Sequence, residues 1–220
     1  MPLELTIPAR INIMGNPTDA LEGDFAAISA AVDLRAGARV EPAEALVMEQ
    51  CRRTDGGLDV VARQSFALDA LPLPYDGELD LVKGAVNRLY FHSIELREKL
   101  SQGGVRIATW TDVPRQSGLG GSSLFVLLTL AGLRAHYDLD RQVHNDYVLA
   151  ELTQRVEAKE LGITCGYADR YVPLFGGLAY VDYRGKLYQR AIDEEPFATY
   201  ERLDARVEAL PLVAVSTGVR

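Results

Sequence analysis

The feature that most constrains this chain is a glycine- and serine-rich segment, residues 114–123, between two apolar runs. A strand-like run precedes it (residues 105–112), and an apolar run with helical character follows it (residues 124–133). Glycines let a backbone approach a ligand closely, and the free N–H groups and dipole of a helix N-terminus favour an anion. The segment therefore predicts a phosphate-binding turn that leads from a strand into a helix.

A plainer interpretation of the same segment is a turn with a capped helix start, which such clusters also form. The segment is neither of the two common nucleotide loops. It lacks the Gly-Lys-Ser/Thr ending of a P-loop, and its glycine spacing differs from that of a dinucleotide fingerprint. The local sequence alone leaves both interpretations open.

The composition indicates a globular chain with a substantial core. Of its 220 residues, 48% are hydrophobic, and the formal net charge is −8. Sequence-independent binding to nucleic acid or to an anionic membrane needs a basic surface, so the charge argues against both. The first residues do not form a signal peptide, and the longest apolar run is too short to span a bilayer. We therefore expect a cytoplasmic chain with no nucleic-acid or membrane partner.

Apolar periodicity predicts an α+β fold, in which a mixed β-sheet is backed by helices. Strands are expected in the first forty residues, in a hairpin within residues 47–61 and in a second hairpin over residues 177–191. Helical spacing predicts one helix over about residues 81–100 and another over about residues 145–161. Trp110, on the strand before the glycine-rich segment, is expected in the core.

Three segments, in order along the chain, resemble motifs of the GHMP kinases. The pattern Pro-x-x-x-Gly-Leu-Gly-x-Ser-Ser at residues 114–123 resembles the ATP-binding motif of that family. Residues 8–19 are similar to its first motif, which meets the substrate, and residues 166–177 to the segment with its catalytic aspartate. The resemblance implies the fold of the family's N-terminal domain. It also implies an ATP- and Mg²⁺-dependent kinase that acts on a small-molecule hydroxyl.

Finer details most resemble the glucuronokinases within that family. They are residues 15–19, residues 113–118, and residues 158–163 continuing to Asp169 and Arg170. Heptose-phosphate kinases share the pattern Asp-x-Tyr-x4-Gly-Gly, however. The resemblance therefore implies a sugar or sugar-acid substrate, with glucuronate first and a heptose phosphate or another monosaccharide as the alternative.

The resemblance also assigns roles to single residues. It makes Asp169 the acceptor of the hydroxyl proton and places Arg10 near the transferred phosphoryl group. Glu157 is expected to bind Mg²⁺ together with Ser122, with Glu160 as the competing carboxylate. Expected contacts to ATP come from Pro114, Ser117, Gly118, Leu119, Gly120, Gly121, Ser122 and Ser123.

One departure from the family pattern lies in the loop, where Gly121 stands at the position of a common serine. Glucuronokinases resemble this chain in that respect, and the metal-ligand role accordingly moves to Ser122, with Ser123 as a helix cap or phosphate contact. The turn with Asn16, Thr18 and Asp19 is expected to bind sugar hydroxyls. Arg170 or Arg115 would meet the carboxylate of a uronic acid, because a guanidinium fits a carboxylate with two hydrogen bonds.

We expect residues 1–208 to form the ATP-binding domain and residues 209–220 to begin a second domain that this chain does not contain. The exposed edge of such a chain predicts self-association. Two further functions are compatible with this organisation. One is a catalytically incomplete module that binds a sugar or a nucleotide. The other is a nucleic-acid-binding protein on a similar scaffold, which the net charge disfavours.

Overall fold

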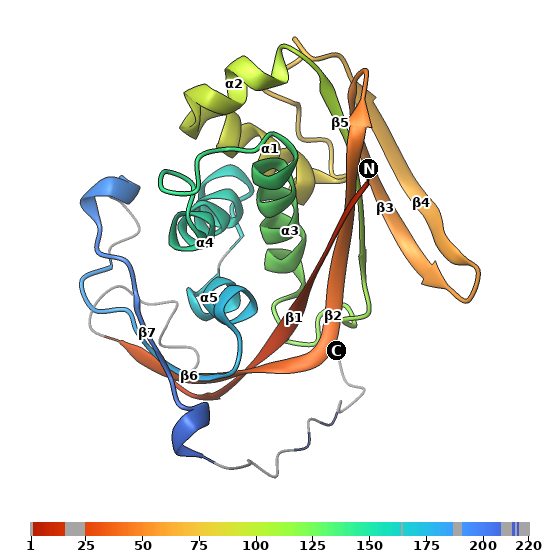
Figure 1. The fold of residues 1–220 in the computed structure, drawn as a ribbon. Helices are drawn as coiled ribbons and strands as arrows, with labels where there is room; N and C mark the ends of the chain where they lie inside the picture. The colour runs from red at the N-terminus through yellow and green to blue at the C-terminus, as the bar shows by residue number, and fades with distance from the viewer. Residues whose placement is uncertain are drawn as a thin grey trace.

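The structure, a computed structural model, describes residues 2–15, 25–163, 165–186 and 191–207, together with Val213 and Val215. It confirms the predicted α+β fold. Seven strands pair in one mixed sheet, and the helices lie against its concave face (Figure 1). The strands are β1 (Leu3–Met14), β2 (Ala26–Ala43), β3 (Leu46–Thr54), β4 (Gly57–Phe66), β5 (Gly104–Thr111), β6 (Leu178–Asp182) and β7 (Thr199–Arg202).

The long strand β2 organises the sheet. It pairs with β1 along one edge, and along the other edge with β5 and then with β6, all antiparallel. The sheet order is β4-β3-β5-β2-β6-β7, and β3 and β5 are parallel. Between its pairings with β5 and β6, the backbone of β2 accepts a hydrogen bond from Asp112 N and donates one to Gly177 O, each at 2.9 Å. The end of β5 and the start of β6 therefore lie beside neighbouring residues of β2.

The helices cover this sheet around the central helix α3 (Gly121–His136). Most of its apolar residues are buried, and it packs against α1 (Asp80–His92), β1, β2 and β5. The others are α2 (Ile94–Leu100), α4 (Asp146–Arg155) and α5 (Ala168–Phe175). One continuous cluster of buried apolar residues joins α1, α3 and α4 to the sheet. The start of α3, where the glycine-rich segment ends, is thereby held firmly.

The two long predicted helices both differ from expectation. The first is broken at Ser93, which has φ −113° and whose Oγ accepts a hydrogen bond from Leu96 N at 3.0 Å. A serine that caps the next helix competes with continuation of the first one. The second helix changes after Arg155 into a π-helical turn, Val156–Glu160, and Gly162 follows with φ 64°. Such π-turns are frequent at functional sites, and glycine suits the left-handed end.

The C-terminal hairpin also differs from the prediction. Strand β6 pairs with β7 over residues 179–182, so its partner lies later in the chain than residues 186–191. Lys186 turns inward, where its Nζ lies 2.7 Å from Glu151 Oε1 of α4. Residues 187–190 lie outside the described residues, as do residues 209–220 apart from Val213 and Val215. The predicted second domain and self-association stay predictions.

Trp110 is buried, as expected, on the face of the sheet away from the helices, with Cys51 and Ala108. Its ring lies directly on Gly37 of β2, where an added Cβ would be 2.3 Å from the ring carbon Cζ2.

We expect Gly37→Ala to lower the free energy of unfolding by about 1–3 kcal/mol, because the large ring of Trp110 must move. Urea unfolding measures the loss. Gly103→Ala is the control, since its Cβ would meet no atom within 4 Å, and equal midpoints for the two variants would contradict this packing.

Candidate active site

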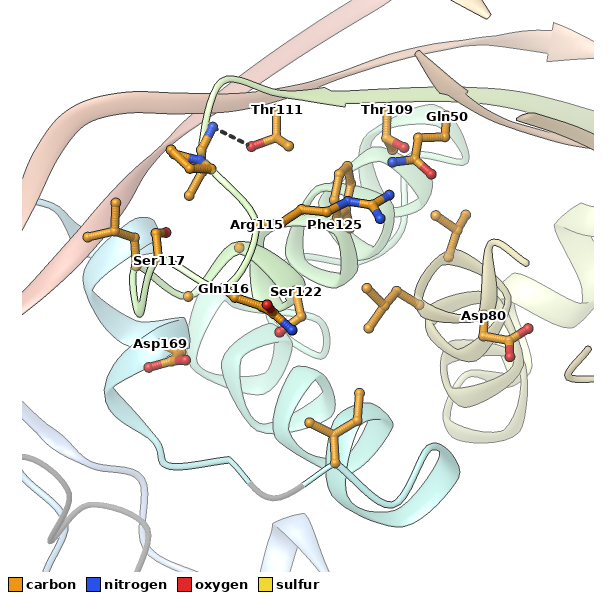
Figure 2. A pocket seen from close by; sticks show the side chains of 18 of the residues that line it. Gln50, Asp80, Thr109, Thr111, Arg115, Gln116, Ser117, Ser122, Phe125 and Asp169 are labelled. Carbon is orange, nitrogen blue, oxygen red and sulfur yellow. Dashed lines mark hydrogen bonds between the residues drawn. The ribbon is translucent and has the colours of Figure 1, made fainter. Parts of the chain in front are cut away.

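A cavity of about 760 Å³ opens between the β5–α3 loop and the start of α1. Figure 2 shows the side chains around it. Its walls include residues 113–122 of the loop, Asp169 of α5 and Arg10 of β1 at one side, and residues 79–82 at the other. Segments far apart in the sequence thus meet around one space large enough for a nucleotide-sized ligand.

The backbone of the glycine-rich loop is shaped for an anion. Gly118 and Gly120 have φ 72° and 76°, in the left-handed region that favours glycine. Gly120 immediately precedes α3, no side chain caps that helix, and no acidic residue lies in its first turn. The first N–H groups of α3 therefore have no acidic or capping side chain from the helix itself as a partner. Together with the helix dipole, they can bind an anion. This geometry favours the anion-binding interpretation over a side-chain-capped helix start.

Arg10 and Asp169 form an ion pair beside this loop. Arg10 Nε donates to Asp169 Oδ1 at 2.8 Å, and a second guanidinium nitrogen contacts the same oxygen. Arg10 also donates to the carbonyl oxygen of Gly118. Its side chain is only 8% exposed and that of Asp169 only 18%. β1 thus holds the carboxylate of α5 against the loop, and a Cβ on Gly120 would lie 3.4 Å from that carboxyl group.

A second carboxylate, Glu157 in the π-helical turn, lies beneath the start of α3. Its two oxygens accept hydrogen bonds of 2.6 Å from Ser122 Oγ and Ser123 Oγ. Glu160 points elsewhere: it pairs with Arg88 of α1 and accepts a hydrogen bond from Tyr75. Of the two carboxylates expected as metal ligands, Glu157 is therefore the one that lies beside Ser122.

The oxygens of Ser122 and Glu157 fit a magnesium ion in chemical type. Mg²⁺ prefers oxygen ligands and usually keeps few protein ligands, since phosphate oxygens and water supply the rest. Within the described ranges, no group of three or more His, Cys, Asp or Glu residues could hold a metal ion. A metal here would consequently depend on a bound phosphate for much of its coordination.

Arg170 is fully buried and does not line the cavity, so the expected contact with a sugar carboxylate is not what the structure shows. Its Nη2 donates to Glu157 Oε2 at 2.7 Å, and Glu157 is itself 1% exposed. Burial lowers the pKa of Arg170, but the nearby carboxylates, Glu157 first, outweigh burial and raise it above its ordinary value. Arg170 is a buried partner that holds the Glu157 carboxylate in place.

Arg115, the other arginine expected for the carboxylate, does line the cavity, but it points away from Asp169 toward Gln50 (Figure 2). Asn16, Thr18 and Asp19 lie outside the described residues. None of the three histidines lines this cavity. Of the other loop residues of the expected ATP site, Pro114, Ser117, Leu119 and Gly121 line it. Ser123 does not: it is fully buried and its Oγ donates to Glu157, so the structure shows it neither as the helix cap nor as a contact in the cavity.

The end of the cavity opposite Asp169 was not predicted from the sequence. Gln50 of β3, Thr109 of β5 and Phe125 of α3 lie there, together with Asp80 at the start of α1 (Figure 2). Each comes from a different part of the chain, and none belongs to a motif. Only the pairing of β3 with β5 and the packing of α1 beside α3 bring them together.

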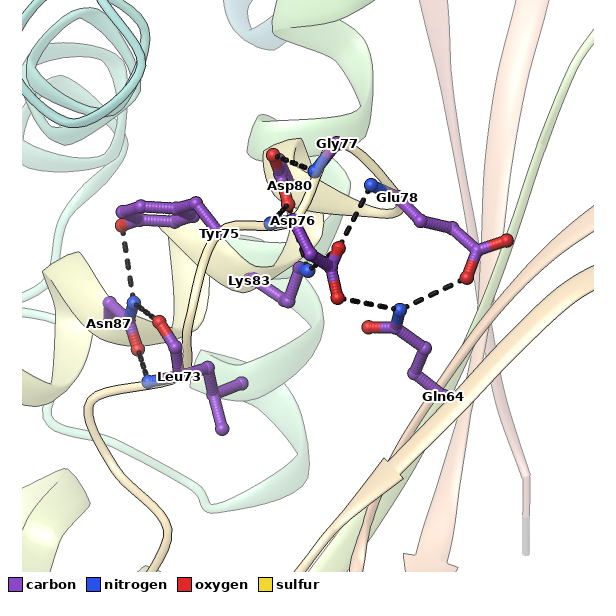
Figure 3. A network of polar contacts seen from close by, with 9 residues as sticks. All are labelled: Gln64, Leu73, Tyr75, Asp76, Gly77, Glu78, Asp80, Lys83 and Asn87. Atoms are coloured by element: carbon purple, nitrogen blue, oxygen red, sulfur yellow. Dashed lines mark hydrogen bonds and ion pairs between the residues drawn. The ribbon is translucent and has the colours of Figure 1, made fainter.

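A polar network holds this end in place (Figure 3). The buried Lys83 contacts Asp76 at 2.5 Å and Asp80 at 2.8 Å, and Asp80 accepts a hydrogen bond from Gly77 N at 2.8 Å. The hydrogen bond from Lys83 lowers the pKa of Asp76 to about 2. Beside this network, the side chain of Asn87 on α1 accepts a hydrogen bond from Leu73 N and donates to Leu73 O and to the hydroxyl of Tyr75. The loop before α1 is therefore fixed as a wall of the cavity.

The mixed sheet, the glycine-rich loop and the two carboxylates beside it belong to one α+β domain. Residues 80–177 match the family described as GHMP kinases N terminal domain. The match includes the loop, Glu157 and Asp169 but not Arg10.

Comparison with curated proteins finds sugar kinases. The chain is 30% identical to glucuronokinase 1 of Arabidopsis thaliana over 176 residues, which are 80% of this chain and 47% of that protein. It is 32% identical to a D-glycero-alpha-D-manno-heptose 7-phosphate kinase of Campylobacter jejuni over 108 residues, which are 49% of this chain and 30% of that protein. The chain thus spans less than half the length of these relatives.

Solved structures share the fold. A D-glycero-D-manno-heptose 1-phosphate kinase from Bacteroides thetaiotaomicron superposes with a TM-score of 0.67 at 25% identity, over 84% of this chain and 56% of that one. A galactokinase of Lactococcus lactis, solved with galactose, has a TM-score of 0.66 at 22% identity, over 82% of this chain and 44% of that one. Across the described ranges, no helix is long and apolar enough to cross a membrane.

Proposed function

We propose that this chain carries the ATP-binding half of the active site of a sugar kinase of the GHMP type. The observation that carries the proposal is the convergence of three features at one cavity, whose wall includes Arg10, Asp169 and Ser122, while Glu157 is buried behind Ser122. The three features are the uncapped start of α3, the Arg10–Asp169 pair and the Ser122–Glu157 pair. A phosphoryl-transfer site needs a place for phosphates, a proton acceptor and charge neutralisation, and the three features match these needs.

The triphosphate of ATP would lie along the loop, with its phosphates at the N–H groups of Gly121 and Ser122. Gly118 and Gly120 let the backbone come close there. The base would extend toward Gln50 and Phe125, because the cavity continues in that direction, away from Asp169. The terminal phosphate would then face Asp169 and Arg10.

Asp169 would take the proton of the sugar hydroxyl. As the hydroxyl oxygen forms its bond to the terminal phosphorus, the bond from that phosphorus to the oxygen of ADP breaks, and the proton passes to the carboxylate. Arg10 holds that carboxylate in one orientation and places positive charge beside the transferred group. Mg²⁺, when bound, supplies further neutralisation of phosphate charge. Ser122 and Glu157 would hold it.

Glucuronate is the substrate that we favour, and two observations support it. The glucuronokinase match covers 80% of this chain, whereas the heptose 7-phosphate kinase match covers 49%. The glycine at position 121 and residues 113–118 also resemble the glucuronokinases. A heptose phosphate remains the second candidate, because relatives that act on heptose phosphates appear both among the curated proteins and among the solved structures.

A substrate panel tests this proposal. The protein is incubated with ATP and Mg²⁺ and with glucuronate, galactose, mannose or a heptose phosphate, and ADP release is measured. We expect release to be fastest with glucuronate and to stop when EDTA removes the metal. Isothermal titration with ATP tests the nucleotide site without turnover. ATP binding with no preference among sugars would leave only the nucleotide-binding module, and an absence of ATP binding would contradict the proposal as a whole.

A further inference from the structure

Arg115 is a cation in the cavity that the proposed reaction leaves without a role. Among the described residues that line the cavity, Arg10 and Arg115 are the two that carry a positive charge. Arg10 is committed to Asp169 and to the carbonyl oxygen of Gly118. No hydrogen bond or ion pair joins Arg115 to the described part of the chain, and its side chain is exposed. A free guanidinium in a ligand-sized cavity is available for a ligand.

The direction of Arg115 separates it from the acceptor side of the cavity. Its side chain runs beside Phe125 toward Gln50, while Asp169 lies on the other side of the loop (Figure 2). Two features restrict the backbone on either side of Arg115: Pro114 precedes it, and Gln116 follows with φ 57°, which is uncommon for a residue with a side chain. The Arg115 guanidinium therefore points away from the place that a sugar bound at Asp169 would occupy.

We propose that Arg115 binds the base of the nucleotide, with its flat guanidinium lying on the purine ring. This inference rests on the proposed nucleotide site. A guanidinium is planar and weakly hydrated, so it stacks on aromatic faces better than an ammonium group does. The phosphates belong at the start of α3, and Arg115 points from the loop toward the opposite end. Arg115 is then a nucleotide-binding residue and not a receptor for the carboxylate of a sugar acid.

Nucleotide affinity tests the proposal on the chain as it stands. ATP, ADP and adenosine each displace a fluorescent ATP analogue from the wild type and from Arg115→Ala. Because the cation would stack on the base that all three ligands share, we expect roughly a tenfold loss of affinity, of similar size for each of them. Arg141→Ala, which removes an exposed arginine outside the cavity, is the matched control and should bind like the wild type.

Several results would overturn the inference. A loss for ATP and ADP but not for adenosine would assign Arg115 to the phosphates. Unchanged nucleotide binding with weaker glucuronate binding would restore the carboxylate role. Arg115→Lys keeps the charge but loses the planar group, so full affinity in that variant would rule out stacking. If the wild type binds no nucleotide, the proposed function fails as well, whereas normal ATP binding by Arg115→Ala removes this inference alone.

Discussion

Replacement of Asp169 by Asn should lower turnover by about 10²–10⁴-fold while affinity for ATP changes little. Asn has nearly the same shape, but it does not accept the hydroxyl proton, and that proton moves only as the transition state forms. Turnover is measured as ADP release with ATP, Mg²⁺ and glucuronate, and affinity by titration with ATP. Both measurements use the same preparation, so a loss of folded protein would lower ATP binding as well as turnover.

Two controls separate chemistry from folding in the Asp169 variant. Asp59→Asn changes an exposed aspartate on β4, outside the cavity, and should retain full turnover. Urea unfolding shows how much stability is lost with the ion pair to Arg10. Turnover of Asp169→Asn within about threefold of the wild type, in folded protein, would contradict the role of Asp169 as proton acceptor.

Replacement of Glu157 by Gln should lower the free energy of unfolding by about 3–5 kcal/mol, because it leaves Arg170 as an uncompensated buried charge. Both side chains are almost fully inaccessible, at 1% and 0% exposure, so water does not replace the lost partner. The variant should also lose the dependence of ATP binding on Mg²⁺. Urea unfolding and titrations of ATP with and without Mg²⁺ measure the two effects.

A paired substitution distinguishes the structural effect from the metal effect. Glu157→Leu with Arg170→Met removes both buried charges and should recover most of the stability, but not the Mg²⁺ dependence. Glu160→Gln is the control on the same turn, and because its ion pair with Arg88 is partly exposed, it should cost at most about 1 kcal/mol. If Glu157→Gln were as stable as the wild type, this account of Arg170 would be wrong.

The sequence was sufficient for features that depend on neighbouring residues. The glycine-rich turn, its position between a strand and a helix, and the burial of Trp110 all follow from short-range patterns, and the structure confirms them. The break at Ser93 was also local, since serine is a common N-cap, but the apolar spacing continued through it and concealed it. The order of the three motifs was readable for the same reason, because each motif is one uninterrupted segment.

Features that join distant segments were beyond the sequence. Whether Glu157 or Glu160 meets Ser122 depends on the rotation of a π-helical turn, which apolar spacing does not reveal. Arg170 is adjacent to Asp169 in the chain, yet the helix α5 turns one side chain toward the cavity and the other into the protein. The far end of the cavity assembles from strands and helices that meet only after the sheet forms. A linear pattern records which side chains are present, whereas their directions are set by packing across the whole fold.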